Sequence, residues 1–275
     1  MTTPRIYPPP GHLLRQLGIT LDRREVDRLT STMPVPVEIC DASGEARLAV
    51  IGVMVDMAAG TLTVRQVEPD WTATFDLAIH RIAGAPAGST LHAVSRVVRA
   101  GRNSVVSETT VDADGEPVAY AEVTFSRLPR RGDTPVTVVA DVVDYGKGEA
   151  AIAEPIAEVV GFERRSPGVV EFGLRETIRN SFGSVQGGVV AVSLEEAALD
   201  LAASTPDPAT GVPMVGPRLG FLHVYYLGAA KGGPFRSTAT VLRHQPASST
   251  ARVELLDVGG DHLMAQGTAI AEPAD

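Results

Sequence analysis

Cysteine and excess positive charge are both scarce in this sequence. Cys40 is the only cysteine among 275 residues, so no internal disulfide can form and a reducing compartment fits. Lys and Arg number 24 against 33 Asp and Glu, which gives a formal net charge of −9. Because phosphate backbones bind basic surfaces, this balance argues against a nucleic-acid partner.

Long apolar runs are also lacking. The stretch from Leu48 to Val55 is far shorter than the roughly 20 residues needed to cross a bilayer. The opening residues, "MTTPRIYPPPGHLL", show no apolar segment of the kind found in signal peptides. We therefore expect a cytoplasmic protein without a membrane partner. The six histidines are scattered, so we expect no metal site.

An internal repeat is present instead. Residues 33–60 align with residues 172–199 at a constant offset of 139, which pairs Asp41 with Asn180 and Asp56 with Glu195. Each copy consists of a short extended segment, a polar loop and an apolar helix with an acid near its middle. The acids stand out, because a carboxylate rarely enters an apolar run without a partner or a function.

The segments downstream of each helix also match. Residues 89–125 and 233–272 alternate apolar and polar residues and predict three antiparallel strands each. The sequences "DADGEP" and "DVGGD" supply hairpin turns in corresponding places. The second half has a small insertion, which falls in the Pro-rich loop 204–213.

The repeat predicts an α+β fold with two units in tandem. Each unit is a long central helix wrapped by a curved antiparallel sheet, and the two units form a pseudo-dimer. The helices, expected at 47–60 and 186–203, must be wrapped because apolar residues occupy nearly all their faces. We expect an N-terminal unit over 1–130, a connector over 131–164 and a C-terminal unit over 165–275.

A motif at the start of the second helix resembles a known family. Asn180, Gln186, Gly187, Gly188 and Glu195 match the pattern N-x5-[H/Q]-G-G-x6-[D/E], which is similar to the PaaI-like acyl-CoA thioesterases. "VDMAAG", "VVRAGRN" and "VDADGEPVAYAEVTF" in the first half are similar to the same branch. The resemblance covers residues 30–127 and 165–272. It implies a tandem, or double, hotdog fold, hydrolysis of acyl-CoA thioesters without a separate cofactor, and a homodimer of double-hotdog chains.

The spacing of the motif predicts a site built from both halves. Gly187 and Glu195 are eight residues apart on one helix, or about 12 Å. An oxyanion donor and an acid or base must both lie within roughly 3 Å of the reacting groups. The donor of one half must therefore work with the acid of the other half.

We call the first crossed set Site A: Asp56, Thr74, Asn180, Gln186 and Gly187. Asp56 is expected to act as general base or as nucleophile, and the N–H of Gly187 to bind the oxyanion. The resemblance implies that Asn180 orients water or the carbonyl, and that a hydroxyl after the acid helix assists, here Thr74. Gln186 replaces the histidine of many members, so it cannot titrate near neutral pH.

Substrate binding is expected to involve further residues. Gly188 lets the backbone approach a ligand closely. Arg99 and Arg102, in "RVVRAGRN", are candidates for the phosphates of coenzyme A, although arginines on an edge loop are often only surface residues.

The second crossed set, Site B, comprises Asp41, Arg47, Leu48, Glu195 and Leu219. It has lost the glycine and the hydroxyl, and it carries an acid where Site A has Asn180. We expect Site B to be degenerate.

Two other functions stay open. A hotdog enoyl-CoA hydratase needs a histidine beside its aspartate, and neither predicted helix contains one. A non-catalytic acyl-CoA-binding protein is the second alternative, which the degeneration of Site B makes credible.

Overall fold

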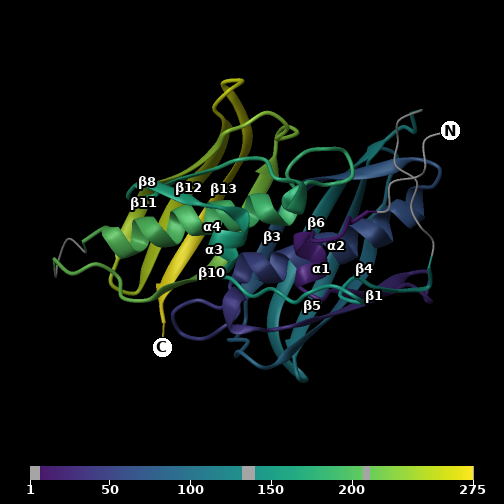
Figure 1. The fold of residues 1–275 in the computed structure, drawn as a ribbon, viewed down its shortest axis with the longest axis horizontal. Coiled ribbons are helices and arrows are strands. Elements are labelled where there is room, and N and C mark those ends of the chain that lie inside the picture. The colour runs from purple at the N-terminus through teal and green to yellow at the C-terminus, as the bar shows by residue number, and fades with distance from the viewer. Residues whose placement is uncertain (1–6, 132–139, 207–210, 275) are drawn as a thin grey trace.

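Two long helices lie side by side, each wrapped by one half of a continuous sheet (Figure 1). They are α2 (Leu48–Val67) and α4 (Gly187–Ser204). This computed structural model describes residues 7–131, 140–206 and 211–274. The expected arrangement of a central helix and a curved antiparallel sheet in each half is confirmed.

Thirteen strands of the described residues form this sheet, and all neighbours are antiparallel. Their spatial order is β7 (Val142–Asp144), β1 (Thr20–Asp22), β2 (Arg28–Pro34), β4 (Thr90–Ala100), β5 (Ser104–Ala113), β6 (Glu116–Leu128), β3 (Trp71–Arg81), β10 (Pro217–Tyr226), β13 (His262–Pro273), β12 (Ser248–Asp257), β11 (Phe235–Gln245), β9 (Val169–Phe172) and β8 (Glu163–Ser166). The three strands predicted downstream of each helix are all present.

The order of the strands reveals an internal twofold relation. β3 and β10 pair at the centre, and the next five strands outward correspond in the two halves, while β7 at the edge of the first half has no counterpart among the described residues. Even the irregularities recur: the register shift between Val97 and Arg99 in β4 matches the shift between Val241 and Arg243 in β11. A bulge is a specific local feature, so its repetition supports the internal repeat read from the sequence.

Helix α2 ends seven residues beyond the expected end at residue 60. Gly60 lies inside the helix, where a Cβ would be 3.4 Å from the ring of Phe125, an ordinary packing distance. The helix stops at Glu68, where the following Pro69 disfavours helical backbone. By length and composition α2 could cross a membrane, but 78% of its apolar window is buried within the protein.

The expected connector is divided between the two units. β7 pairs with β1 and so extends the sheet of the first half. The short helix α3 (Ile156–Val160) precedes β8 just as α1 (Leu13–Gln16) precedes β1. Residue 164, expected to be the last of the connector, lies within β8.

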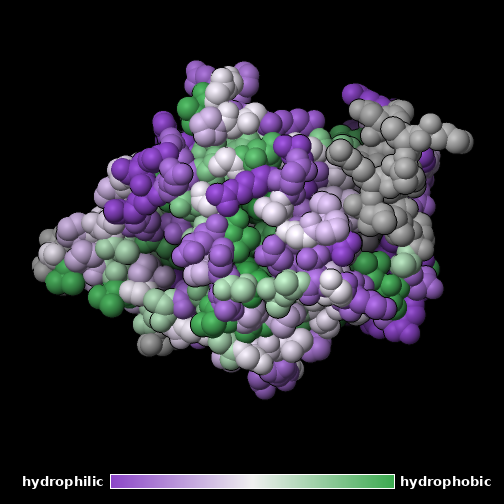
Figure 2. All heavy atoms as spheres, in the orientation of Figure 1, coloured by the Kyte–Doolittle hydropathy of each residue, from purple (hydrophilic) through white to green (hydrophobic). Residues whose placement is uncertain are grey.

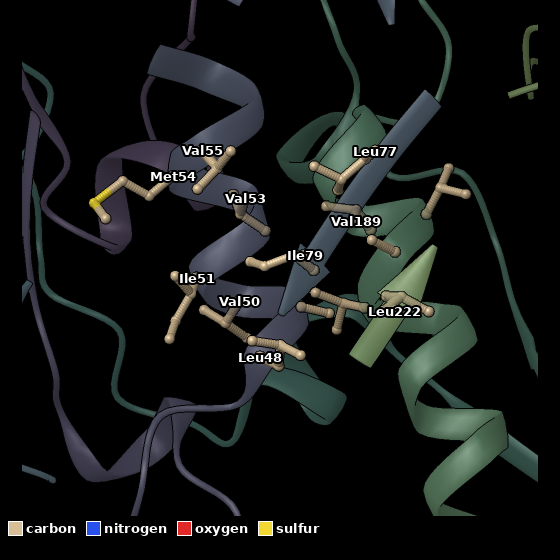
Figure 3. Packing of buried hydrophobic residues seen from close by; sticks show 14 of the residues in the cluster. Leu48, Val50, Ile51, Val53, Met54, Val55, Leu77, Ile79, Val189 and Leu222 are labelled. Atoms are coloured by element: carbon tan, nitrogen blue, oxygen red, sulfur yellow. The ribbon is translucent and has the colours of Figure 1, made fainter. Parts of the chain in front are cut away.

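The two halves share one hydrophobic core. Val53 and Val55 of α2, Leu77 and Ile79 of β3, and Leu222 of β10 are buried in a single cluster formed by the helices and the sheet (Figure 3). On the face drawn in Figure 2, hydrophilic side chains surround smaller hydrophobic areas. The packing of α2 and α4 across this core brings Site A together.

Candidate active site

The carboxylate of Asp56 lies at the junction of the two halves, only 7% exposed, and three donors meet it. Thr74 Oγ1 donates to Oδ1 at 2.7 Å, and Gln186 Nε2 donates to Oδ2 at 2.9 Å. The backbone N–H of Gly188 also hydrogen-bonds this carboxylate. Thr74 belongs to the first half and the other two donors to the second half, so the acid and the α4 motif meet across the halves.

Gln186 is held by the helix that it begins. It is the N-cap of α4, and its Oε1 accepts from the N–H of Val189 at 3.0 Å. Since the amide oxygen is engaged by that N–H, its nitrogen must face Asp56. The residue therefore caps the helix and orients the acid at the same time.

Most of the first N–H groups of α4 have a hydrogen-bond acceptor. The N–H of Gly188 meets Asp56, and those of Val189 and Val190 donate to Gln186. Within the described parts of the chain, the N–H of Gly187 has no acceptor. An unpaired N–H at a helix start, next to a buried acid, can donate to an oxyanion.

The two glycines have different steric roles. A Cβ on Gly187 would lie 2.8 Å from Asp56 Oδ2, so only glycine lets the carboxylate come this close. A Cβ on Gly188 would lie 2.5 Å from the Cα of Val53, which shows that the backbones of α2 and α4 touch there. Gly188, expected to contact substrate, packs between the helices and uses its N–H on Asp56.

The side chain of Asn180 shapes the loop that leads to Gln186. Its Oδ1 accepts from the N–H groups of Phe182 and Ser184, both at 3.0 Å. Asp41, its counterpart in the first half, accepts from the N–H of Ser43 at 2.9 Å in the same way. The oxygen of Asn180 is therefore engaged within its loop, and the structure does not bring the side chain to the Asp56 carboxylate.

Burial raises the pKa of Asp56 to about 6, while hydrogen bonds from Thr74 and Gly188 oppose the shift. A carboxyl with this pKa is mostly ionised at neutral pH, yet it is a much better base than an exposed aspartate. Site A thus contains a carboxylate suited to accept a proton near neutral pH.

Two tyrosines near Asp56 were missed in the sequence. Burial raises the pKa of Tyr7 and of Tyr226, and the charge of Asp56 adds to both shifts. Tyr226 donates its hydroxyl to the carbonyl of Gly187 at 2.9 Å. Neither tyrosine lies in a motif, so no sequence signal pointed to them.

Site B has the same framework with different chemistry. Glu195 is fully buried, and the N–H of Ala49 donates to its Oε1 at 3.3 Å. Arg47 Nε donates to Glu195 Oε2 at 3.0 Å, and Arg47 Nη1 pairs with Glu196 at 2.7 Å. The acid of Site B is thus part of a buried ion pair.

The other positions of Site B are apolar. Leu48 begins α2 where Gly187 begins α4. Leu219 is fully buried and stands at the register shift of β10, the place that Thr74 takes in β3. Site B therefore has neither the hydroxyl nor the glycine of Site A.

Arg99 and Arg102 lie away from the acid. Both are exposed. The paired residues that lead across the sheet from the end of β4 to Thr74 in β3 pass through β5 and β6. Three strand spacings correspond to about 14 Å, so these arginines can reach only a distant part of a bound molecule.

Metal ligands are not grouped in the parts of the chain that the structure describes. No cluster of three or more His, Cys, Asp or Glu there could hold an ion. Among the described residues, Asp56 is surrounded by a hydroxyl, an amide nitrogen and a backbone N–H, all of which donate hydrogen bonds to it.

Solved structures place this architecture among known folds, although no protein-family model and no curated protein matches the chain. An acyl-ACP thioesterase from Bacteroides thetaiotaomicron matches with a TM-score of 0.61 and 14% identity, over 90% of this chain and 99% of that one. The 12:0-ACP thioesterase from Umbellularia californica matches with a TM-score of 0.61 and 11% identity, over 91% and 95%. The tesB protein of Mycobacterium avium subs paratuberculosis matches with 0.61 and 12%, over 93% and 96%.

The chain has the double hotdog fold. These neighbours cover nearly all of it, so the fold expected from the repeat is confirmed over both halves of the double hotdog. At 11 to 14% identity the likeness concerns the fold, and the chemistry must be argued from Site A.

Proposed function

We propose that this double hotdog protein hydrolyses acyl-CoA thioesters at Site A. The observation that carries the proposal is the buried Asp56 carboxylate, held by Thr74 and Gln186 beside the unpaired N–H of Gly187. A base and an oxyanion donor within one small region are what hydrolysis of a thioester requires.

In the proposed reaction, Asp56 accepts a proton from a water molecule as that water attacks the thioester carbonyl. The N–H of Gly187 donates to the resulting oxyanion. When the intermediate collapses, the carbon–sulfur bond breaks and the thiolate takes the proton from Asp56. The products are a free acid and coenzyme A, and Asp56 is again ionised.

Direct attack by Asp56 is the alternative course. It would form a mixed anhydride, which water then hydrolyses. A single turnover in ¹⁸O-labelled water identifies the direct course when water attacks the Asp56 carbonyl of the anhydride, because the acid is then released unlabelled and the enzyme is labelled. A labelled acid in that first turnover fits the general-base course, or attack of water on the acyl carbonyl of the anhydride, and trapping of the acyl-enzyme then separates these two.

Coenzyme A belongs to the substrate, and we propose no separate cofactor. Arg99 and Arg102 are proposed to contact its phosphates, at a distance from the acid that suits only the far end of the substrate. Two of the structural neighbours are named as ACP thioesterases, so thioesters of a carrier protein belong in the same assay.

The test is release of free thiol from a panel of acyl-CoA and acyl-ACP thioesters, with Asp56→Asn as the matched control. Turnover by the wild type and not by the control supports the proposal. Hydration of an enoyl-CoA without thiol release would identify a hydratase instead. Saturable acyl-CoA binding without any turnover would identify a binding protein.

We further propose that the protein acts in the cytoplasm, as a homodimer of double-hotdog chains. Site A takes its residues from a single chain, so dimerisation is not needed to complete it. Light scattering that gives a single species of 28.8 kDa would remove the dimer without affecting the catalytic proposal.

A further inference from the structure

Tyr226 is placed to act on Site A through the backbone. It is the last residue of β10, and its hydroxyl donates to the carbonyl of Gly187 at 2.9 Å. That carbonyl belongs to the first residue of α4, directly beside the Asp56 carboxylate.

The carbonyl of Gly187 and the N–H of Gly188 belong to one planar peptide group. Tyr226 holds one side of this group, and the N–H on the other side holds the Asp56 carboxylate. A hydrogen bond to the carbonyl fixes the plane and polarises the peptide, which strengthens the bond that its N–H donates.

The degenerate half lacks this arrangement. Tyr226 pairs with Ala265 in β13 just as Arg81 pairs with Ala119 in β6, so Arg81 is its counterpart. Arg81 donates instead to the carbonyls of Leu219 and Ala46. The tyrosine thus occurs only in the half whose helix start meets Asp56.

We propose that Tyr226 is a positioning residue of Site A, which holds the Asp56 carboxylate in its working orientation through the peptide that joins Gly187 to Gly188. The role of Tyr226 in catalysis rests on the proposed function, whereas its effect on the pKa of Asp56 can be measured without turnover. Burial keeps the phenol protonated, because the pKa of Tyr226 is raised well above its usual value.

Removal of the hydroxyl should weaken the bond from Gly188 to the ionised carboxylate. A hydrogen bond to the charged form lowers a carboxyl pKa, so its weakening raises the pKa of Asp56. We expect Tyr226→Phe to shift the Asp56 titration upward by about half a unit to one unit, a three- to tenfold change in proton affinity.

The experiment titrates ¹³C-labelled aspartate carboxyls by NMR, with the Asp56 signal assigned by its loss in Asp56→Asn. Tyr225→Phe is the matched control, because Tyr225 is 43% exposed and points to the other face of the sheet. The expected result is an upward shift in Tyr226→Phe, none in Tyr225→Phe, and the same shift in the acid limb of kcat/KM.

Site-specific 3-fluorotyrosine at position 226 serves as the second variant, since a more acidic phenol donates more strongly. It should lower the Asp56 midpoint, a change that a merely structural role would not produce. An unmoved Asp56 midpoint in either folded variant overturns the proposal. If the midpoint moves as expected but the wild type releases no thiol, the proposed function fails and the role of Tyr226 stands.

Discussion

The two crossed sites of this molecule share one framework but differ in the residue that accompanies the buried acid. In each, a carboxylate in one helix meets a backbone N–H at the start of the other helix: Asp56 meets Gly188, and Glu195 meets Ala49. The residue just before the helix also donates to the acid in both sites. At Site A it is the neutral Gln186, and at Site B it is the cation Arg47.

This difference in charge adds to the hydroxyl and the glycine that only Site A has. Burial raises the pKa of both acids, to about 6 for Asp56, which has no cation beside it, whereas Arg47 opposes the shift at Glu195. Glu195 is compensated by Arg47, and a buried pair of this kind is costly to break. An internal repeat can thus keep its framework while the surroundings of its two buried acids diverge.

The largest effect should separate the two acids directly. We expect Asp56→Asn to lower kcat/KM by about 10³-fold, within the range for removal of a general base, while Glu195→Gln keeps most of the activity. Steady-state thiol release measures both, and circular dichroism checks the fold. A dead Glu195→Gln with an active Asp56→Asn would assign catalysis to Site B, and equal partial losses would mean two working sites.

A second prediction concerns the stability of Site B. Arg47→Met leaves Glu195 buried without its main partner, so we expect a loss of about 3–5 kcal/mol in the free energy of unfolding. The double variant Arg47→Met with Glu195→Met should regain most of it. The control is Arg24→Met, whose pair with Asp22 is exposed and screened by solvent, so its removal should change stability little. An equally small loss in Arg47→Met would show that the pair between Arg47 and Glu195 is not structural.

A third prediction follows from the pKa of Asp56, which is near 3.8 in the unfolded chain and about 6 in the folded protein. Protonation therefore favours the folded state. Protonation of Asp56 adds about 3 kcal/mol to the free energy of unfolding. This contribution is complete below pH 3.8 and is lost as the pH rises through 6.

Urea unfolding of wild type and Asp56→Asn between pH 4.5 and 7 measures this contribution. The stability of the wild type relative to the variant should fall by about 2 kcal/mol over that range. Activity should change in the opposite sense: it should increase with pH over this range, with an acid limb near pH 6. A difference in stability that does not depend on pH would contradict a raised pKa for Asp56.

The crossed pairing was accessible from the sequence because helical geometry alone separates the start of α4 from Glu195 by about 12 Å. A constant offset between the repeats then aligned each acid with its counterpart. The fold followed from the alternation of the strands and from the hairpin turns, which are local signals. The end of α2 was misplaced because Gly60 is tolerated inside the helix against Phe125.

Individual contacts between side chains distant in sequence could not be predicted from the sequence. Alignment placed Arg47 opposite Gln186, but it could not show that the guanidinium lies on Glu195. Asn180 matches a catalytic motif, although its oxygen is engaged in its own loop. Tyr226 reaches Gly187 from the end of a strand outside any motif, so only the packed structure could reveal it.

The smallest effects should come from changes at two corresponding positions: Thr74, which places a hydroxyl in Site A, and Leu219, which takes its place in Site B. Thr74→Val removes a donor at 2.7 Å from the Asp56 carboxylate. Hydrogen bonds to charged groups contribute about 1.5–3 kcal/mol, so we expect a loss of roughly ten- to a hundredfold in kcat/KM and an upward shift of its acid limb.

The mirror change, Leu219→Thr, should leave kcat/KM unaltered, because it adds a hydroxyl to a site whose acid is paired with Arg47. It should cost about 1–3 kcal/mol of stability, since a hydroxyl replaces a fully buried apolar side chain without an assured partner. Kinetics and urea unfolding of the two variants measure both quantities. A gain in turnover for Leu219→Thr would mean that Glu195 is catalytically competent, and unchanged kinetics for Thr74→Val would mean that the hydroxyl does not act on Asp56. Opposite signatures, activity lost in one and stability lost in the other, are what an ionised base at Site A and an ion pair at Site B require.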